Sequence, residues 1–121
     1  MRLERDYYET MVARLNGQTG MFVVRLKSNC DVYQGHFPGE PICPGVYNIQ
    51  LVRECAERLA RRSLRIRTIQ RCRLTALLTP TPNRELIVCI QFSPLDNGFA
   101  CRATISDAQQ TYMEFKGDLT T

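Results

Sequence analysis

A single long segment with helical periodicity restricts the folds open to this chain. Apolar residues recur at i, i+3 and i+4 spacing over residues 45–62, which predicts one helix with a broad apolar face. After Ser63 the period changes, and segments with strand-like composition follow one another. A helix with one apolar face must bury it against another layer. The pattern therefore predicts an α+β domain in which an antiparallel sheet wraps around one long central helix.

The other segments are expected to be strands, except at the N-terminus. Apolar and β-branched residues predict strands over residues 20–28, 64–78, 85–93, 99–106 and 110–117. Alternation in the segment 64–78 is incomplete, so we expect it to be bent or bulged. Tyr7, Met11 and Leu15 fall at helical spacing, which predicts a short helix over residues 3–16 within a helical or irregular leader, residues 1–19. Because no linker or repeat divides the sequence, residues 1–121 are expected to form one domain.

A loop rich in proline and glycine precedes the predicted helix. Residues 36–45 read His-Phe-Pro-Gly-Glu-Pro-Ile-Cys-Pro-Gly and contain the only histidine of the chain. Proline fixes φ and glycine permits close turns, so this loop is expected to be rigid. It would hold one imidazole at a fixed place beside the start of a helix. Because a free imidazole titrates near neutral pH, His36 is the candidate general base.

This segment resembles the active-site segment of the 3-hydroxyacyl-acyl-carrier-protein dehydratases. The resemblance covers residues 34–54 and rests on the pattern His-Phe-Pro-Gly-x-Pro-x-x-Pro-Gly followed by a helix. It implies the hot-dog fold, which agrees with the expected order of elements. It also implies dehydration of a 3-hydroxyacyl thioester on acyl carrier protein to a trans-2-enoyl thioester, without a metal or other cofactor.

The resemblance assigns roles to individual positions. His36 would remove the proton at C2, the backbone N–H of Gly45 would bind the thioester oxygen, and the carbonyl of Ile42 would hold the histidine ring. Phe37 and Tyr47 would line an acyl tunnel along the helix, although aromatic residues at these positions are equally suited to the core. Family members carry this site between two subunits, so a homodimer or a multiple of dimers is expected.

The chain departs from the family at the proton donor. The family carries an acid at the position of Gln50 and commonly a glutamine at the position of Glu54, so the two residue types are exchanged. Residues i and i+4 share a helix face, and we expect Glu54, partly buried, to supply the proton while Gln50 orients substrate or water. Two other interpretations stay open: Glu54 forms an exposed pair with Arg58, or Gln50 marks a site that has lost catalysis.

Two further functions therefore remain compatible with the sequence. One is a hot-dog acyl thioesterase in which Glu54 activates water. The other is a catalytically impaired acyl-binding subunit that pairs with an active homologue. The histidine loop argues against the thioesterase, because thioesterases of this fold generally lack it, whereas Gln50 is the feature that supports the impaired subunit.

A basic cluster suggests one kind of partner. The chain has 16 Lys and Arg against 12 Asp and Glu, and its arginines gather at Arg58, Arg61, Arg62, Arg65 and Arg67. The cluster is either a solvated helix end, where cations suit the helix dipole, or a docking patch for an acidic partner. The resemblance favours acyl carrier protein as that partner. Nucleic acid is not expected, because no recognition motif is present and aromatic residues do not interleave with the cluster.

Other classes of protein are not expected. The six cysteines are widely spaced and accompany one histidine, so no zinc site is predicted; those within predicted elements, Cys55, Cys72, Cys89 and Cys101, are expected to act as small apolar residues. No apolar stretch reaches the length of a membrane span, and the charged first residues differ from a signal peptide. A cytoplasmic protein is therefore expected.

Overall fold

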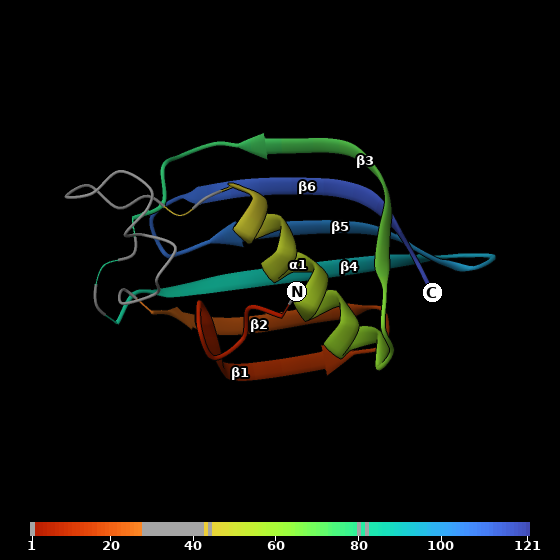
Figure 1. Cartoon of the computed structure of the whole chain (residues 1–121), viewed down its shortest axis with the longest axis horizontal. Coiled ribbons are helices and arrows are strands. Elements are labelled where there is room, and N and C mark those ends of the chain that lie inside the picture. The colour runs from red at the N-terminus through yellow and green to blue at the C-terminus, as the bar shows by residue number, and fades with distance from the viewer. Residues whose placement is uncertain (1, 28–42, 44, 80, 82) are drawn as a thin grey trace.

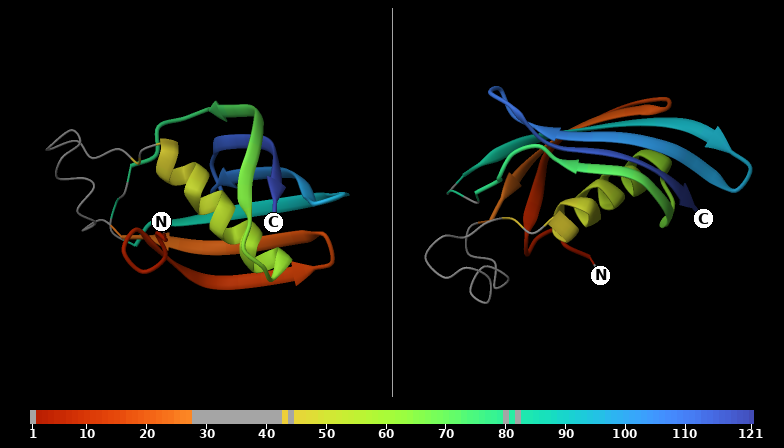
Figure 2. Two further views of the ribbon diagram at one scale, coloured as in Figure 1. Left: turned by 45° about the vertical axis from the view of Figure 1, so that its right-hand side comes forward. Right: turned by 90° about the horizontal axis from the view of Figure 1, so that it is seen from above.

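The structure is a computed structural model that describes residues 2–27, 43, 45–79, 81 and 83–121. Within these residues, six antiparallel strands form one sheet in the order β1-β2-β4-β5-β6-β3, and one helix lies across it (Figure 1). The strands are β1 (Tyr8–Asn16), β2 (Thr19–Leu26), β3 (Arg65–Leu74), β4 (Glu85–Leu95), β5 (Gly98–Ser106) and β6 (Thr111–Thr120), and the helix is α1 (Gly45–Ala60). The sheet curves around α1 (Figure 2), as the helical and strand periods predicted.

The core lies between α1 and the sheet face that it covers. Strand β4 shows the division clearly, because Val88 and Ile90 are buried while Cys89 and Gln91 are exposed on the opposite face. The helix contributes the buried apolar side chains Leu51, Val52, Cys55, Ala56 and Leu59. We refer to the sheet face away from α1 as the outer face. Cys89 is exposed on this outer face, so the expectation that it acts as a small apolar residue is wrong.

The N-terminal segment differs from its prediction. Instead of a helix over residues 3–16, the chain forms the edge strand β1, which pairs with β2 from Tyr8 to Asn16. A two-residue loop joins the strands, and Gly17 adopts a positive φ of 63° there, a conformation typical of tight hairpins. The pairing register shifts between Thr10 and Val12. This register shift interrupts the alternation of inward and outward side chains that a regular strand shows. The apolar residues of β1 therefore fall at a spacing that resembles that of a helix.

The opposite edge of the sheet is β3, and its bulged character is confirmed. Its register with β6 shifts twice, between Ile66 and Thr68 and between Ile69 and Arg71. The strand is shorter than predicted and carries exposed apolar side chains, with Ile69 at 45% and Leu74 at 61% exposure. The described helix is not long and apolar enough to cross a membrane.

Candidate functional site

The predicted site lies only partly within the described residues. His36, Phe37 and Ile42 fall outside them, so their roles stay predictions. Gly45 is the first residue of α1, where the N–H groups lack intrahelical acceptors and form the positive end of the helix dipole. A Cβ atom on Gly45 would lie 3.1 Å from Cδ1 of Leu74. The start of α1 therefore lies against the end of β3, and it has the kind of donor that the prediction requires.

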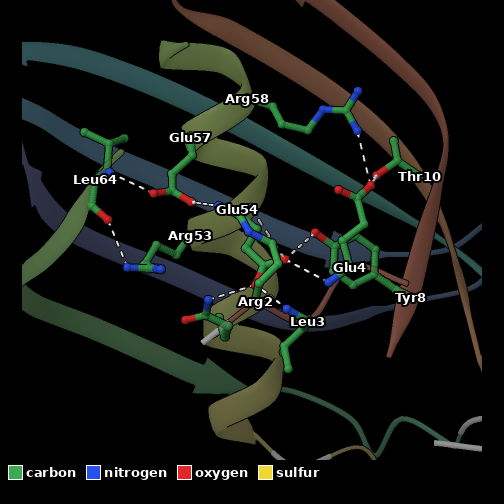
Figure 3. Close-up of polar contacts among 11 residues, drawn as sticks. Arg2, Leu3, Glu4, Tyr8, Thr10, Arg53, Glu54, Glu57, Arg58 and Leu64 are labelled. Atoms are coloured by element: carbon green, nitrogen blue, oxygen red, sulfur yellow. Dashed lines mark hydrogen bonds and ion pairs between the residues drawn. The ribbon is translucent and has the colours of Figure 1, made fainter. Parts of the chain in front are cut away.

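Glu54 is the most constrained polar side chain of α1. It is completely buried, with an exposure of 0%. Its carboxylate accepts four hydrogen bonds (Figure 3), from the Leu3 N–H at 2.6 Å, the Glu4 N–H at 3.1 Å, the Tyr8 hydroxyl at 2.8 Å and the Gln50 amide at 2.8 Å. Because a carboxylate offers about four acceptor positions, these four donors saturate it. Glu54 thus anchors the N-terminal segment, residues 2–8, to the helix.

The alternative interpretation, in which Glu54 forms an exposed pair with Arg58, is wrong. Arg58 instead donates to the Glu4 carboxylate at 3.3 Å, and the Thr10 hydroxyl donates to the same oxygen at 2.7 Å. Glu54 is also directed toward the N-terminal segment, but its carboxylate is buried there and accepts from the Glu4 N–H. Among the residues that the structure describes, the cation paired with it is Arg2, whose Nη1 lies 4.0 Å from Glu54 Oε1.

Two ionisable neighbours of Glu54, Tyr8 and Cys55, are held in their neutral forms. Burial, followed by the nearby Cys55 thiol and the Glu54 carboxylate, raises the pKa of Tyr8 well above its usual value. Tyr8 therefore keeps its proton and remains a hydrogen-bond donor. Burial likewise raises the pKa of the Cys55 thiol. Because the thiolate is the reactive form of cysteine, Cys55 is an apolar core residue, as predicted, and not a nucleophile.

A second buried carboxylate lies on the next turn of α1. Glu57 accepts from the Arg2 guanidinium at 3.1 Å and from the Leu64 N–H at 2.9 Å, and Arg53 donates to the Leu64 carbonyl at 3.0 Å. These contacts tie the helix both to the N-terminal segment and to the residue that precedes β3 (Figure 3). Sequence reasoning missed Glu57, because Arg2 and Leu64 meet the helix only in the folded chain.

The first turns of α1 carry another polar contact and the predicted tunnel residue. Asn48 is buried and accepts a hydrogen bond from the Tyr7 hydroxyl at 3.0 Å. The rings of Tyr7 and Tyr47 meet edge to face, with centroids 5.2 Å apart. Tyr47 is half-buried and packs against the core, while its role in lining a tunnel stays a prediction. Sequence reasoning missed Asn48, although a polar residue within the apolar face of a predicted helix is a signal that could have indicated it.

The predicted docking arginines lie at the far end of α1. Arg58 is in the last turn, Arg61 and Arg62 follow the helix, and Arg65 begins β3. The guanidinium of Arg62 lies 5.2 Å from the centroid of the Phe99 ring, a cation–π contact. The structure thus brings these residues to one end of the molecule, and two of them already have intramolecular partners.

A curved antiparallel sheet around one central helix is the hot-dog architecture. Residues 13–114 match the model of the ApeI-like family, described as ApeI dehydratase. Since this match spans most of the chain, the chain belongs to the ApeI-like dehydratase family. It is therefore a dehydratase-type hot-dog protein, which agrees in general terms with the resemblance seen in the histidine loop. No curated protein matches the sequence.

Solved structures share this fold at low sequence identity. A structure of the dehydratase heterocomplex ApeI:P from Xenorhabdus doucetiae is 22% identical, with a TM-score of 0.75 over 93% of this chain and 96% of that chain. The HP0420-homologue from Helicobacter felis is 8% identical, with a TM-score of 0.71 over 100% and 93%. An uncharacterized protein from Erwinia carotovora subsp. atroseptica is 15% identical, with a TM-score of 0.64 over 92% of each chain. These likenesses establish the hot-dog fold of the chain.

Proposed function

We propose that this chain dehydrates a 3-hydroxyacyl thioester carried on acyl carrier protein to the trans-2-enoyl thioester. Membership in a dehydratase family carries the proposal. The sequence around His36, which leads directly into α1 at Gly45, supports the same reaction. Elimination of water from a β-hydroxy thioester needs a base, a proton donor for the leaving hydroxyl and a donor to the thioester oxygen.

In the proposed reaction His36 takes the proton from C2, the hydroxyl on C3 leaves as water after gaining a proton, and a double bond forms between C2 and C3. Negative charge builds on the thioester oxygen during proton removal. The N–H of Gly45 would donate to that oxygen, where the dipole of α1 adds to the stabilisation. Base catalysis by His36 would contribute about 10²- to 10⁴-fold in rate.

Glu54 remains the proposed proton donor, with a condition set by its contacts. As the acid it would carry a proton on one oxygen, yet both oxygens already accept two hydrogen bonds each. Glu54 could give a proton to substrate only after one of these donors leaves. Gln50 is the one donor that lies on α1 itself, one turn before Glu54, and its movement would free an acceptor position on Glu54 Oε2.

The same contacts favour a second candidate function. A saturated Glu54 and a glutamine at position 50 suit an acyl-binding subunit that lacks its own acid and pairs with an active homologue. The similar structure from Xenorhabdus doucetiae is itself a dehydratase heterocomplex. In this case the partner would complete the site.

Pairing through β3 would suit either function. Strand β3 is an edge of the sheet, and its unpaired backbone groups form a template for a strand of another subunit. Exposed apolar residues gather near the start of α1, with Val46 at 65% and Leu77 at 74% exposure in addition to Leu74. We propose that a homodimer, or a multiple of dimers, buries this edge.

Acyl carrier protein is proposed to dock at the arginine cluster. Arg61 and Arg65 are exposed, whereas Arg58 and Arg62 already contact Glu4 and Phe99. The cluster lies about 22 Å from Gly45, judged from the rise of an α-helix. Because Arg58 and Arg62 already have contacts within the chain, an acidic carrier would meet chiefly Arg61 and Arg65.

The test is turnover of 3-hydroxyacyl thioesters of several chain lengths on acyl carrier protein, followed by the absorbance of the enoyl product. Wild type would be compared with His36→Ala, Gln50→Ala and Glu54→Gln. Glu57→Gln is the matched control, because Glu57 is also buried on α1 but lies one turn beyond the proposed acid. A thermal unfolding curve for each variant would separate lost chemistry from lost structure.

We expect a folded His36→Ala to lose at least about 100-fold in kcat, and Glu57→Gln to stay within a few-fold of wild type. An equal loss in folded Glu54→Gln would support Glu54 as the acid. Full activity in Glu54→Gln would remove it from the chemistry and leave it as an anchor. If the wild type is inactive on every substrate, the enzyme proposal is contradicted and the impaired subunit is favoured. Release of free thiol without enoyl product would favour the thioesterase.

A further inference from the structure

A broad hollow opens on the outer face of the sheet, away from α1. Its volume is about 880 Å³, and its lining comes from strands β1 to β6. The hollow is independent of the site discussed above, because α1 and the N-terminal segment lie on the other face. The side chains that surround it include Arg14, Arg71, Arg102 and Lys116, all exposed.

Three of these cations stand side by side across the sheet. In the strand registers, Arg102 of β5 is the partner of Lys116 in β6, and Lys116 is the partner of Arg71 in β3. Neighbouring strands lie about 4.8 Å apart, so the three side chains form one row. Like charges directly opposite each other on a sheet are destabilising. We call this row, with Arg14 on the far side of the hollow, the outer-face cation row.

Within the described part of the chain, no ion pair involves a cation of this row. The ion pairs there involve Arg2, Arg25, Arg58 and Arg84. Glu114 is the one carboxylate in the lining, and its strand partners are Thr104 and Arg73. Four cations therefore face one carboxylate around the hollow. Repulsion between these neighbouring cations lowers the stability of the fold, and no ion pair of the described residues offsets it. The row is therefore suited to bind an anionic ligand.

We propose that this hollow binds a small ligand that carries two or more phosphate groups. Arginine presents paired N–H donors that match phosphate oxygens, and the row offers several cations at the spacing of adjacent strands. Neutral hydrogen-bonding side chains complete the lining, among them Gln91 beside Arg102 in the register. A volume of about 880 Å³ lies within the usual range of small-molecule sites, roughly 300–1,000 Å³. The class of ligand is a nucleotide or a similar polyphosphate ester.

The experiment is calorimetric titration of the full chain with poly-L-glutamate and with five phosphate compounds: inorganic phosphate, pyrophosphate, tripolyphosphate, adenosine triphosphate and coenzyme A. The test variant is Arg102→Gln/Lys116→Gln. The matched control is Arg61→Gln/Arg67→Gln, which removes the same charge from exposed residues outside the hollow. Arg71→Gln repeats the test from β3, in case the double variant does not fold.

We expect affinity to rise from phosphate to tripolyphosphate, and to fall at least about tenfold in the test variant with less than about twofold change in the control. Tighter binding of adenosine triphosphate or coenzyme A than of tripolyphosphate would identify an organic ester as the ligand. Equal losses in both variants, or no binding of any of the five compounds, would overturn the proposal. Tighter binding of poly-L-glutamate than of any phosphate compound, lost in the test variant, would also overturn it and point to an acidic protein surface.

Discussion

Charge gathers in two regions of this molecule, on opposite faces of the sheet, and each is organised differently. On the helix side Glu54 and Glu57 are buried, and hydrogen bonds from the N-terminal segment, Gln50 and Leu64 meet their carboxylates. On the outer face Arg102 and Lys116 are exposed opposite each other without a described counter-ion.

The difference follows from the surroundings of the charge. A carboxylate removed from water is tolerated only when donors replace its hydration, so the helix-side cluster had to be complete. Cations in water are screened and hydrated, so the outer-face cation row can remain incomplete at modest cost. The buried carboxylates, whose hydrogen-bond donors lie within the chain, stabilise the fold. The outer-face cations, which lack ion-pair partners among the described residues, are available to a ligand.

The largest effect is expected from removing Glu54, the buried carboxylate to which the N-terminal segment donates hydrogen bonds. Glu54→Ala would leave the N–H groups of Leu3 and Glu4 and the Tyr8 hydroxyl without their buried acceptor. We expect a loss of about 3–5 kcal/mol in the free energy of unfolding, measured by urea denaturation. Glu54→Gln keeps the side-chain volume and should lose less. A loss below about 1 kcal/mol for Glu54→Ala would contradict the anchoring role.

The next prediction compares two buried acceptors on α1, the Glu54 carboxylate and the Asn48 amide oxygen. Tyr8→Phe removes a hydrogen bond to the Glu54 carboxylate, and Tyr7→Phe removes one to the Asn48 amide oxygen. Hydrogen bonds to charged groups are the stronger, so we expect losses of about 1.5–3 kcal/mol and about 0.5–1.5 kcal/mol respectively. Chemical denaturation of the two variants measures both. Equal losses would show that the charge of Glu54 adds nothing to the contact.

On the outer face a substitution should stabilise the protein. Arg102→Gln/Lys116→Gln removes two like charges that face each other, and we expect a gain of about 0.2–1 kcal/mol at low ionic strength. The gain should shrink as salt screens the repulsion, whereas Arg61→Gln/Arg67→Gln should change little. Thermal unfolding at low and high salt measures this. A destabilised double variant would mean that the cations make favourable contacts within the fold.

The smallest expected effect concerns a compensated charge near the surface. A hydrogen bond from Tyr112, then the N–H groups of Gln109 and Gln110 and the Arg84 guanidinium, hold the pKa of Asp107 below its usual value. Because the folded state favours the ionised carboxyl, its contribution to stability is present above the unfolded pKa, about 3.9, and is lost as the pH falls through the folded pKa. Asp107→Asn should therefore flatten the acid limb of the stability profile, measured by unfolding midpoints at decreasing pH. An unchanged acid limb in Asp107→Asn would contradict this assignment.

Local patterns predicted much of the fold and part of the site. The helical period located α1 to within two residues, and the alternation of β4 to β6 located those strands. The prediction from side-chain periodicity failed for β1, where a register shift near Met11 placed apolar residues at helical spacing. For the site, the proposed acid role required a partly buried Glu54, but the sequence did not indicate that residues 2–8 would bury it. That contact joins Leu3 and Glu54, which are 51 residues apart in the chain.

The sequence by itself determined that one amphipathic helix would lie against an antiparallel sheet, because side-chain periodicity is a local property and an apolar face must be buried. Only the tertiary structure decided which charges are compensated. Glu54 found its donors in the N-terminal segment, and Arg71, Arg102 and Lys116 came into one row only when three strands took their register. Such contacts depend on segments distant in the chain, and the physical reason is that strand pairing and helix docking, not local preference, fix which side chains meet.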